Sequence, residues 1–103
     1  MKNYDKLIRD KIPEIIESEG KKYKIERMSD EEYKEYLNEK LLEETNEYLN
    51  SGEIEELADV LEVIITILDY EGIDFEELED LRQKKAEERG RFEKKIKLLK
   101  VHE

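Results

Sequence analysis

Apolar residues recur along most of the chain at the three- and four-residue spacing of an α-helix, and glycines interrupt this spacing. The pattern predicts three long helices at about residues 30–50, 53–71 and 74–89, with a glycine close after each of them. Ser29, followed by Glu32 three residues later, forms a capping box that marks the start of the first long helix. The expected fold class is therefore a mainly α-helical bundle.

The remaining segments predict shorter elements. A short helix is expected to begin at Pro13, whose fixed φ suits a first helical turn, and to end at Gly20. Residues 23–28, "YKIERM", and the tail at residues 91–99, "RFEKKIKLL", alternate apolar and charged side chains with the period of a β-strand. We expect these segments to pair as a small two-stranded β element that joins the N- and C-terminal segments of a single domain, residues 1–103.

The helix expected at residues 53–71 is apolar on two sides, and Glu56 and Asp59 lie on one of them. The first side comprises Ile54, Leu57, Leu61, Ile64, Ile65 and Leu68, and the other comprises Val60, Val63 and Ile67 with the two acidic residues. A helix that is apolar all round is buried all round. Since so short a chain has too few elements to cover both sides, we expect a second copy to cover one of them, in a homodimer or a higher homo-oligomer.

Charge is distributed unevenly along the chain, whose formal net charge is −11 and whose residues are 48% charged. Residues 1–27 carry a net charge of +2, residues 28–81 of −18 and residues 82–103 of +5. An acidic middle between basic ends suits a cation-binding centre beside anion-binding arms, although ordinary surface variation gives the same counts. The net negative charge and the scattered aromatic residues argue against nucleic-acid binding by the basic ends.

The absence of cysteine excludes a disulfide framework and a metal site built on thiolates. No apolar stretch approaches the roughly 20 residues of a membrane span, and the first residues lack the apolar core of a signal peptide. We therefore expect a cytoplasmic protein that does not associate with membranes.

Acidic side chains three or four residues apart gather on both sides of the break at Gly52. Glu44 falls in the apolar stripe of its helix, where a carboxylate is costly unless something compensates its charge. Glu44 shares a helix face with Glu47, and Glu56 shares one with Asp59, so antiparallel packing across the break would bring the pairs together. Converging carboxylates require a cation, and oxygen ligands favour Mg²⁺, with Mn²⁺ as a substitute. Spacing alone leaves a solvated acidic surface as the alternative.

The segments that carry these carboxylates resemble a known family. "KLLEETNEYL" followed by "EELADVLEVI" is similar to the paired-helix signature of the all-α nucleoside triphosphate pyrophosphohydrolases, the MazG-like superfamily, which reads Glu-Glu-x-x-Glu and then Glu-x-x-Asp. The flanks "YDKLIRDKIPEII" and "KKAEERGRFEKKIKL" resemble the phosphoribosyl-ATP pyrophosphohydrolase-like branch, so the resemblance covers nearly the whole chain. It implies Mg²⁺-dependent cleavage between the α and β phosphates of a nucleotide, giving a monophosphate and pyrophosphate in a housekeeping role. The segment before the first long helix is not typical of the histidine-biosynthesis enzyme, which argues against phosphoribosyl-ATP itself as the substrate.

The resemblance also implies roles for individual residues. The Mg²⁺ ligands would be Glu44, Glu47, Glu56 and Asp59, and the catalytic residues would be Glu43, Glu44 and Glu47. Glu43 would support the ligands or orient the attacking water, and Lys40 would contact phosphate. Further phosphate contacts would come from the basic ends, where the candidates are Arg9, Lys11, Lys84, Lys85, Arg89 and Arg91. Each of these cations could instead be solvated or paired with the acidic middle.

A non-catalytic function on the same fold is the alternative. A helical interaction module would bind partners through its apolar helix faces and would need no reaction at the carboxylates. The two hypotheses differ in whether the purified protein releases pyrophosphate from nucleotides.

Overall fold

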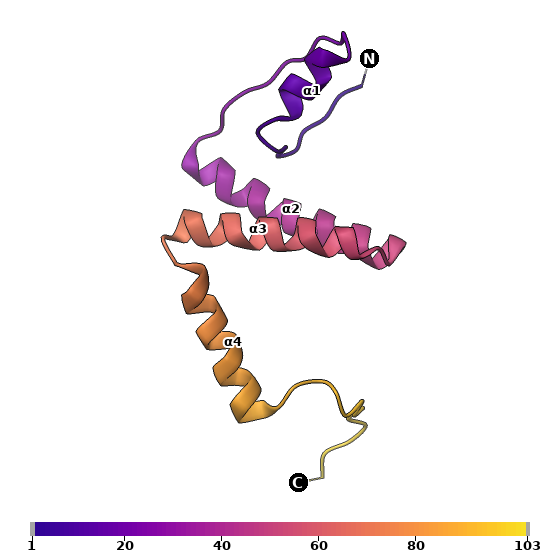
Figure 1. Ribbon diagram of the computed structural model, residues 1–103, viewed down its shortest axis with the longest axis vertical. Coiled ribbons are helices and arrows are strands. Elements are labelled where there is room, and N and C mark those ends of the chain that lie inside the picture. The colour runs from indigo at the N-terminus through magenta and orange to yellow at the C-terminus, as the bar shows by residue number, and fades with distance from the viewer. Residues whose placement is uncertain (1, 103) are drawn as a thin grey trace. The chain divides into compact units, whose positions relative to one another are not determined.

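The structure is a computed structural model that describes residues 2–102 (Figure 1). Its helices are α1 (Ile12–Ser18), α2 (Asp30–Ser51), α3 (Ile54–Glu71) and α4 (Phe75–Arg89). The mainly helical prediction is confirmed, and each predicted helix is present with its ends shifted by a residue or so. Contacts divide the chain into two compact units, the residues up to Gly72 and the residues from Ile73 onward, and each unit is described by itself.

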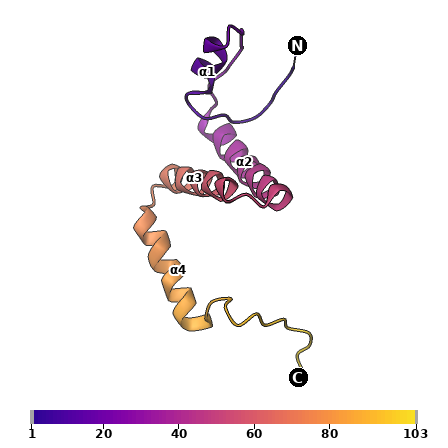
Figure 2. The same cartoon turned by 45° about the vertical axis from the view of Figure 1, so that its right-hand side comes forward.

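Local sequence signals determine where α2 begins and ends. The Oγ of Ser29 accepts a hydrogen bond from the backbone N–H of Glu32 at 3.3 Å, as the predicted N-cap requires. At the other end Gly52 has φ 69°, in the left-handed region, and its N–H bonds to the carbonyl oxygen of Tyr48. Helix α3 begins two residues later, at Ile54, so α2 and α3 form an antiparallel hairpin (Figures 1 and 2).

The core of the first unit lies between α2 and α3, which form the main helix–helix contact of the described residues. Leu37 of α2 is 1% exposed, and Val63 and Leu68 of α3 are also buried. Glu44 is 8% exposed and is the one buried charged residue among residues 2–102. The inward stripe of α2 predicted from its periodicity therefore includes a carboxylate.

The two apolar sides of α3 have different environments. The side that carries Glu56 and Asp59 turns toward α2, and Val63 on this side is buried. Ile54, Leu57 and Leu61 on the other side are 75%, 42% and 45% exposed. The side of α3 that carries Glu56 and Asp59 is thus covered by α2, whereas the other side is exposed in its N-terminal half and buried at Leu68.

The predicted two-stranded β element is wrong for residues 2–102, which contain no strand. Residues 23–28 are irregular, and Ile25 is 56% exposed. In the tail, Lys95 has φ 58° and its N–H approaches the carbonyl oxygen of Phe92 at 3.4 Å, so the backbone turns where a strand would continue. Alternation alone does not form a strand, because an isolated pair of short strands is at best marginally stable in water.

Helix α4 in the second unit has no buried residue. On its surface Arg82 forms an ion pair with Glu79 and donates two hydrogen bonds to its carboxylate. These bonds, together with one from Gln83, hold the pKa of Glu79 at about 2. Each helix in the described part of the chain is too short or too polar to cross a lipid bilayer.

Replacing Gly52 with alanine should destabilise the first unit through backbone strain alone. A Cβ at this position would meet no atom within 4 Å, but φ 69° is unfavourable for any residue with a Cβ. The expected loss is about 1–2 kcal/mol in the free energy of unfolding, measured by urea denaturation followed by circular dichroism. Gly52→Asn is the matched control and should lose less, because asparagine tolerates the left-handed region. Equal stability of the alanine variant and the wild type would contradict this account of the turn.

Candidate metal centre

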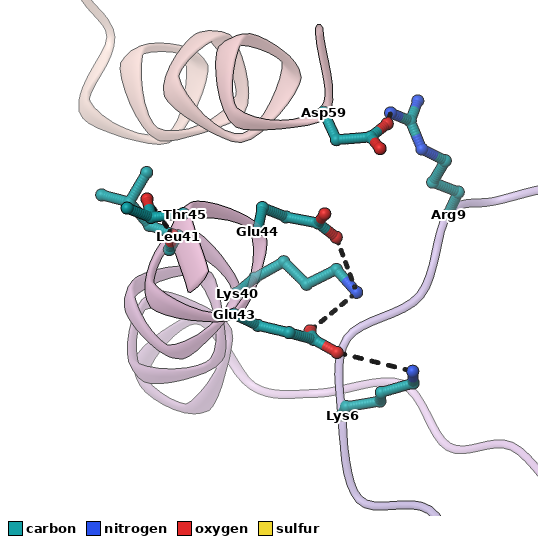
Figure 3. A network of polar contacts seen from close by, with 8 residues as sticks. All are labelled: Lys6, Arg9, Lys40, Leu41, Glu43, Glu44, Thr45 and Asp59. Atoms are coloured by element: carbon teal, nitrogen blue, oxygen red, sulfur yellow. Dashed lines mark hydrogen bonds and ion pairs between the residues drawn. The ribbon is translucent and has the colours of Figure 1, made fainter. Parts of the chain in front are cut away.

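Three carboxylates from α2 and α3 face one another near the turn of the hairpin. Glu44 extends from α2, Glu56 and Asp59 extend from α3, and one oxygen from each lies within 4.8 Å of those of the other two. Glu56 and Asp59 share a face because they are three residues apart on a helix. Figure 3 shows the side chains of Glu44 and Asp59 extending from their helices toward the segment that carries Arg9. The hairpin therefore brings together three of the four predicted metal ligands.

Glu44 is the least satisfied member of this set. Its Oε2 is buried and has no hydrogen-bond partner, while its Oε1 lies 3.4 Å from the Nζ of Lys40. The neighbouring hydroxyl of Thr45 does not help, because it donates to the carbonyl oxygen of Leu41 within α2. Leaving a buried polar atom unpaired costs about 1–3 kcal/mol, so a buried carboxylate that has one unpaired oxygen and two acidic neighbours calls for a ligand.

Glu47, the fourth predicted ligand, is exposed and lies outside the group of three. It is nevertheless close enough to influence Glu44. Burial raises the pKa of Glu44, and the adjacent carboxyl of Glu47 raises it further, against a smaller opposing effect of Lys40. The role of Glu47 as a metal ligand stays a prediction.

Glu43, next to Glu44 in the chain, has the opposite electrostatic environment. The Nζ of Lys40 lies 3.0 Å from a carboxylate oxygen of Glu43, and the Nζ of Lys6 lies 3.5 Å from the other. The hydrogen bond with Lys40 lowers the pKa of Glu43, burial opposes it, and Lys6 adds to the lowering. Burial lowers the pKa of Lys40, but its pairs with Glu43 and Glu44 outweigh this and the net effect is to raise it. The pKa of Glu43 is thus lowered while that of Glu44 is raised, and such a separation allows neighbouring acids to take different tasks.

The segment before α1 brings cations to this centre. The Nη2 of Arg9 donates to the Oδ1 of Asp59 at 2.7 Å, and Lys6 pairs with Glu43 (Figure 3). The hydroxyl of Tyr36 on α2 donates to Asp5, which fastens the same segment and raises the pKa of Tyr36 to about 12. Of the predicted phosphate-binding cations, Arg9 and Lys40 are therefore at the centre.

The remaining predicted cations lie elsewhere. Lys11 is exposed at the start of α1 and has no ion pair among the described residues. In the second unit Lys85, Arg89 and Arg91 line an open groove of about 780 Å³. The rest of its lining is Arg82, Ala86, Gly90, Phe92 and Glu93. Lys84 is exposed on α4 and does not contribute to this groove.

Sequence reasoning missed Lys6 and the bond between Tyr36 and Asp5. Lys6 lies three residues before Arg9 in "KLIR" and belongs to the same basic N-terminal end, so the reasoning that singled out Arg9 could have included it. The hydrogen bond joins residues 31 positions apart, for which the sequence holds no local signal.

The donor set fits a small divalent cation. All three groups offer carboxylate oxygens, which Mg²⁺ and Mn²⁺ prefer over nitrogen or sulfur. Oxygens bound to one Mg²⁺ lie about 3–4 Å apart, given bond lengths of about 2.1 Å, so the observed limit of 4.8 Å requires only small side-chain shifts. Three protein ligands leave coordination positions open to water and phosphate.

Comparisons of the chain with models of protein families, with curated proteins and with solved structures found no match. Fold and site together define a mainly α-helical protein whose central hairpin carries a candidate carboxylate metal centre. The resemblance to the MazG-like superfamily rests on the sequence motifs alone.

Replacing Glu44 with glutamine should stabilise the metal-free protein near neutral pH. Because burial raises the pKa of Glu44 above its usual 4.5, the folded state holds the proton more tightly, and wild-type stability falls as pH rises through the folded pKa. The neutral amide avoids this loss, so the free energy of unfolding in chelator should rise by about 1 kcal/mol, the lower end of the cost of an unsatisfied buried polar group. Urea denaturation at several pH values measures it, and the gain should shrink as pH falls through the raised folded pKa and vanish below the usual pKa of a glutamate.

Glu43→Gln is the matched control, since it makes the same change one residue earlier. The pKa of Glu43 is lowered, so its ionised form stabilises the fold above the usual pKa of a glutamate, and this contribution is lost as pH falls through the lowered pKa. This variant should therefore be less stable than the wild type near neutral pH. A shift in the same direction for both variants would contradict the opposed environments of the two side chains.

Proposed function

We propose that this protein is a Mg²⁺-dependent nucleotide pyrophosphohydrolase, which cleaves the bond between the α and β phosphates of a nucleotide to give a monophosphate and pyrophosphate. The observation that carries the proposal is that Glu44, whose buried Oε2 has no hydrogen-bond partner, clusters with the carboxylates of Glu56 and Asp59. The acidic motifs supply the reaction type, since they resemble the paired-helix signature of such enzymes.

The residues around the centre suit phosphate chemistry. A bound Mg²⁺, held by Glu44, Glu56 and Asp59 with Glu47 beside them, would neutralise phosphate oxygens and acidify a water molecule. Glu43, whose ionised form is favoured by Lys40 and Lys6, would accept a hydrogen bond from the attacking water and so orient it. Lys6 and Arg9 bring positive charge to the rim, where a polyphosphate would otherwise be repelled by the carboxylates.

The test is pyrophosphate release from a panel of canonical and modified nucleoside di- and triphosphates, with Mg²⁺ and with chelator. Release should depend on the metal and should fall by about 100-fold or more in Glu44→Gln and in Asp59→Asn, because even groups that only support metal ligands contribute 10- to 100-fold. Glu62→Gln, an exposed carboxylate on α3, is the matched control and should keep its activity. Release that is insensitive to chelator, or unchanged in Glu44→Gln, would overturn the proposal.

A non-catalytic helical interaction module is the second candidate, favoured by the exposed apolar residues on the hairpin. Leu42 and Leu49 of α2 are 63% and 70% exposed, in addition to the uncovered side of α3. No pyrophosphate release across the panel, from folded protein that still binds Mg²⁺, would favour this function.

We also propose that a second copy of the chain covers the exposed side of α3 in a homodimer. Ile54, Leu57 and Leu61 form a row of large exposed apolar side chains, and closed twofold assemblies are the commonest way to bury such a row.

Sedimentation should give twice the 12.5 kDa mass of one chain, and Leu57→Glu should shift the protein toward the single chain. A charge at this position would have to be desolvated in the dimer, which is costly. The control is Ile25→Glu, which places the same charge at an exposed site away from α3 and should leave the mass unchanged. A wild-type mass of 12.5 kDa would contradict the dimer.

A further inference from the structure

Two of the three clustered carboxylates already have a cation of the protein beside them. The Nη2 of Arg9 lies 2.7 Å from the Oδ1 of Asp59, and the Nζ of Lys40 lies 3.4 Å from the Oε1 of Glu44. The two cations differ in how they are held. Lys40 comes from α2 itself, its side chain is 15% exposed, and it pairs with Glu43 as well. Arg9 comes from the irregular segment before α1, its side chain is 57% exposed, and its ion pair is with Asp59.

A divalent cation cannot enter this centre without affecting the pair of Arg9 and Asp59. The guanidinium is within hydrogen-bond distance of a carboxylate that the metal would use, and two cations at one carboxylate repel one another. Because both side chains are partly exposed, at 57% and 38%, the guanidinium can leave without unfolding of the hairpin. Lys40 can stay, since its pair with Glu43 does not involve the three clustered carboxylates.

We propose that Arg9 is an exchangeable counterion: it occupies Asp59 in the metal-free protein, a divalent metal displaces it, and the displaced guanidinium then binds the phosphates of the substrate. This inference rests on the proposed function and adds an order of events to it. The planar guanidinium offers several N–H donors that match phosphate oxygens in pairs. Once Asp59 is committed to a metal, the nearest acceptors of comparable charge would be the oxygens of a polyphosphate bound to that metal.

The exchange predicts effects of opposite sign for two ligands when Arg9 is replaced. Arg9→Gln removes the competitor, so Mn²⁺, used as the probe metal, should bind about two- to fivefold more tightly, the range of an exposed ion pair. The same variant lacks the phosphate donor, so the Mn²⁺ complex of pyrophosphate should bind about tenfold or more weakly, the size of a charged hydrogen bond. A residue that only stabilised the fold would not change the two affinities in opposite directions.

The experiment uses the full chain and needs no turnover. Mn²⁺ affinity is measured from the electron paramagnetic resonance signal of the unbound ion, and affinity for the preformed Mn²⁺–pyrophosphate complex by calorimetry on protein saturated with Mn²⁺. Lys6→Gln is the matched control, because it removes one cation of the same segment from Glu43, which is outside the three clustered carboxylates. It should tighten Mn²⁺ binding less than Arg9→Gln does. Far-UV circular dichroism checks that both variants keep their helices.

Each result distinguishes the inference from the function on which it rests. Tighter Mn²⁺ binding with weaker pyrophosphate binding in Arg9→Gln, beyond the effects of Lys6→Gln, supports the exchange. Mn²⁺ binding that requires Glu44 but responds equally to the two substitutions overturns the exchange and leaves the metal centre intact. Tighter Mn²⁺ binding with unchanged pyrophosphate binding overturns the transfer of Arg9 to phosphate. Wild-type protein that binds no Mn²⁺, or binds it equally well in Glu44→Gln, overturns the metal centre and the exchange together.

Discussion

The position of Glu44 between α2 and α3 constrains the rest of the first unit. Its side chain lies on the same stripe of α2 as Leu37, so packing the hairpin buries a carboxylate together with the apolar core. A buried carboxylate destabilises the fold unless hydrogen bonds or positive charge compensate it. Lys40 compensates one oxygen of Glu44 and leaves the other without a partner. The packing that forms the core therefore also buries a carboxylate that a further cation would stabilise.

The charges around Glu44 form a graded arrangement rather than a uniform acidic surface. Glu43 is paired with two lysines and is readily ionised, whereas Glu44 faces Glu47 and holds its proton more tightly. Asp59 has Arg9 as its partner, an ion pair that joins residues 50 positions apart. The basic N-terminal segment thus forms ion pairs with the acidic middle of the chain. The segment of Lys6 and Arg9 partly neutralises the carboxylates of the hairpin, in positions from which it can also meet an anion.

Local patterns predicted the helices well because helix ends and helix faces depend on nearby residues. Ser29 caps α2 and Gly52 ends it, and the inward position of Glu44 follows from its spacing to Leu37. The same reasoning placed Glu56 and Asp59 on the covered side of α3, since they lie among apolar residues at helical spacing. It failed for residues 91–99, because alternation does not reveal that Lys95 takes a left-handed conformation. It also missed Lys6, whose contact with Glu43 depends on the path of an irregular segment rather than on periodicity.

A metal at this centre would be coupled to the stability of the hairpin. The unpaired Oε2 of Glu44 destabilises the metal-free fold. Any ligand that binds only the folded state stabilises that state by mass action. Since Glu44 comes from α2 and Glu56 and Asp59 from α3, a shared ion would cross-link the two helices close to the turn at Gly52. The residue that weakens the packing without metal is then the residue that tightens it with metal. This coupling would account for a carboxylate at a core position of so small a hairpin, where an apolar side chain would give a more stable fold with nothing to bind.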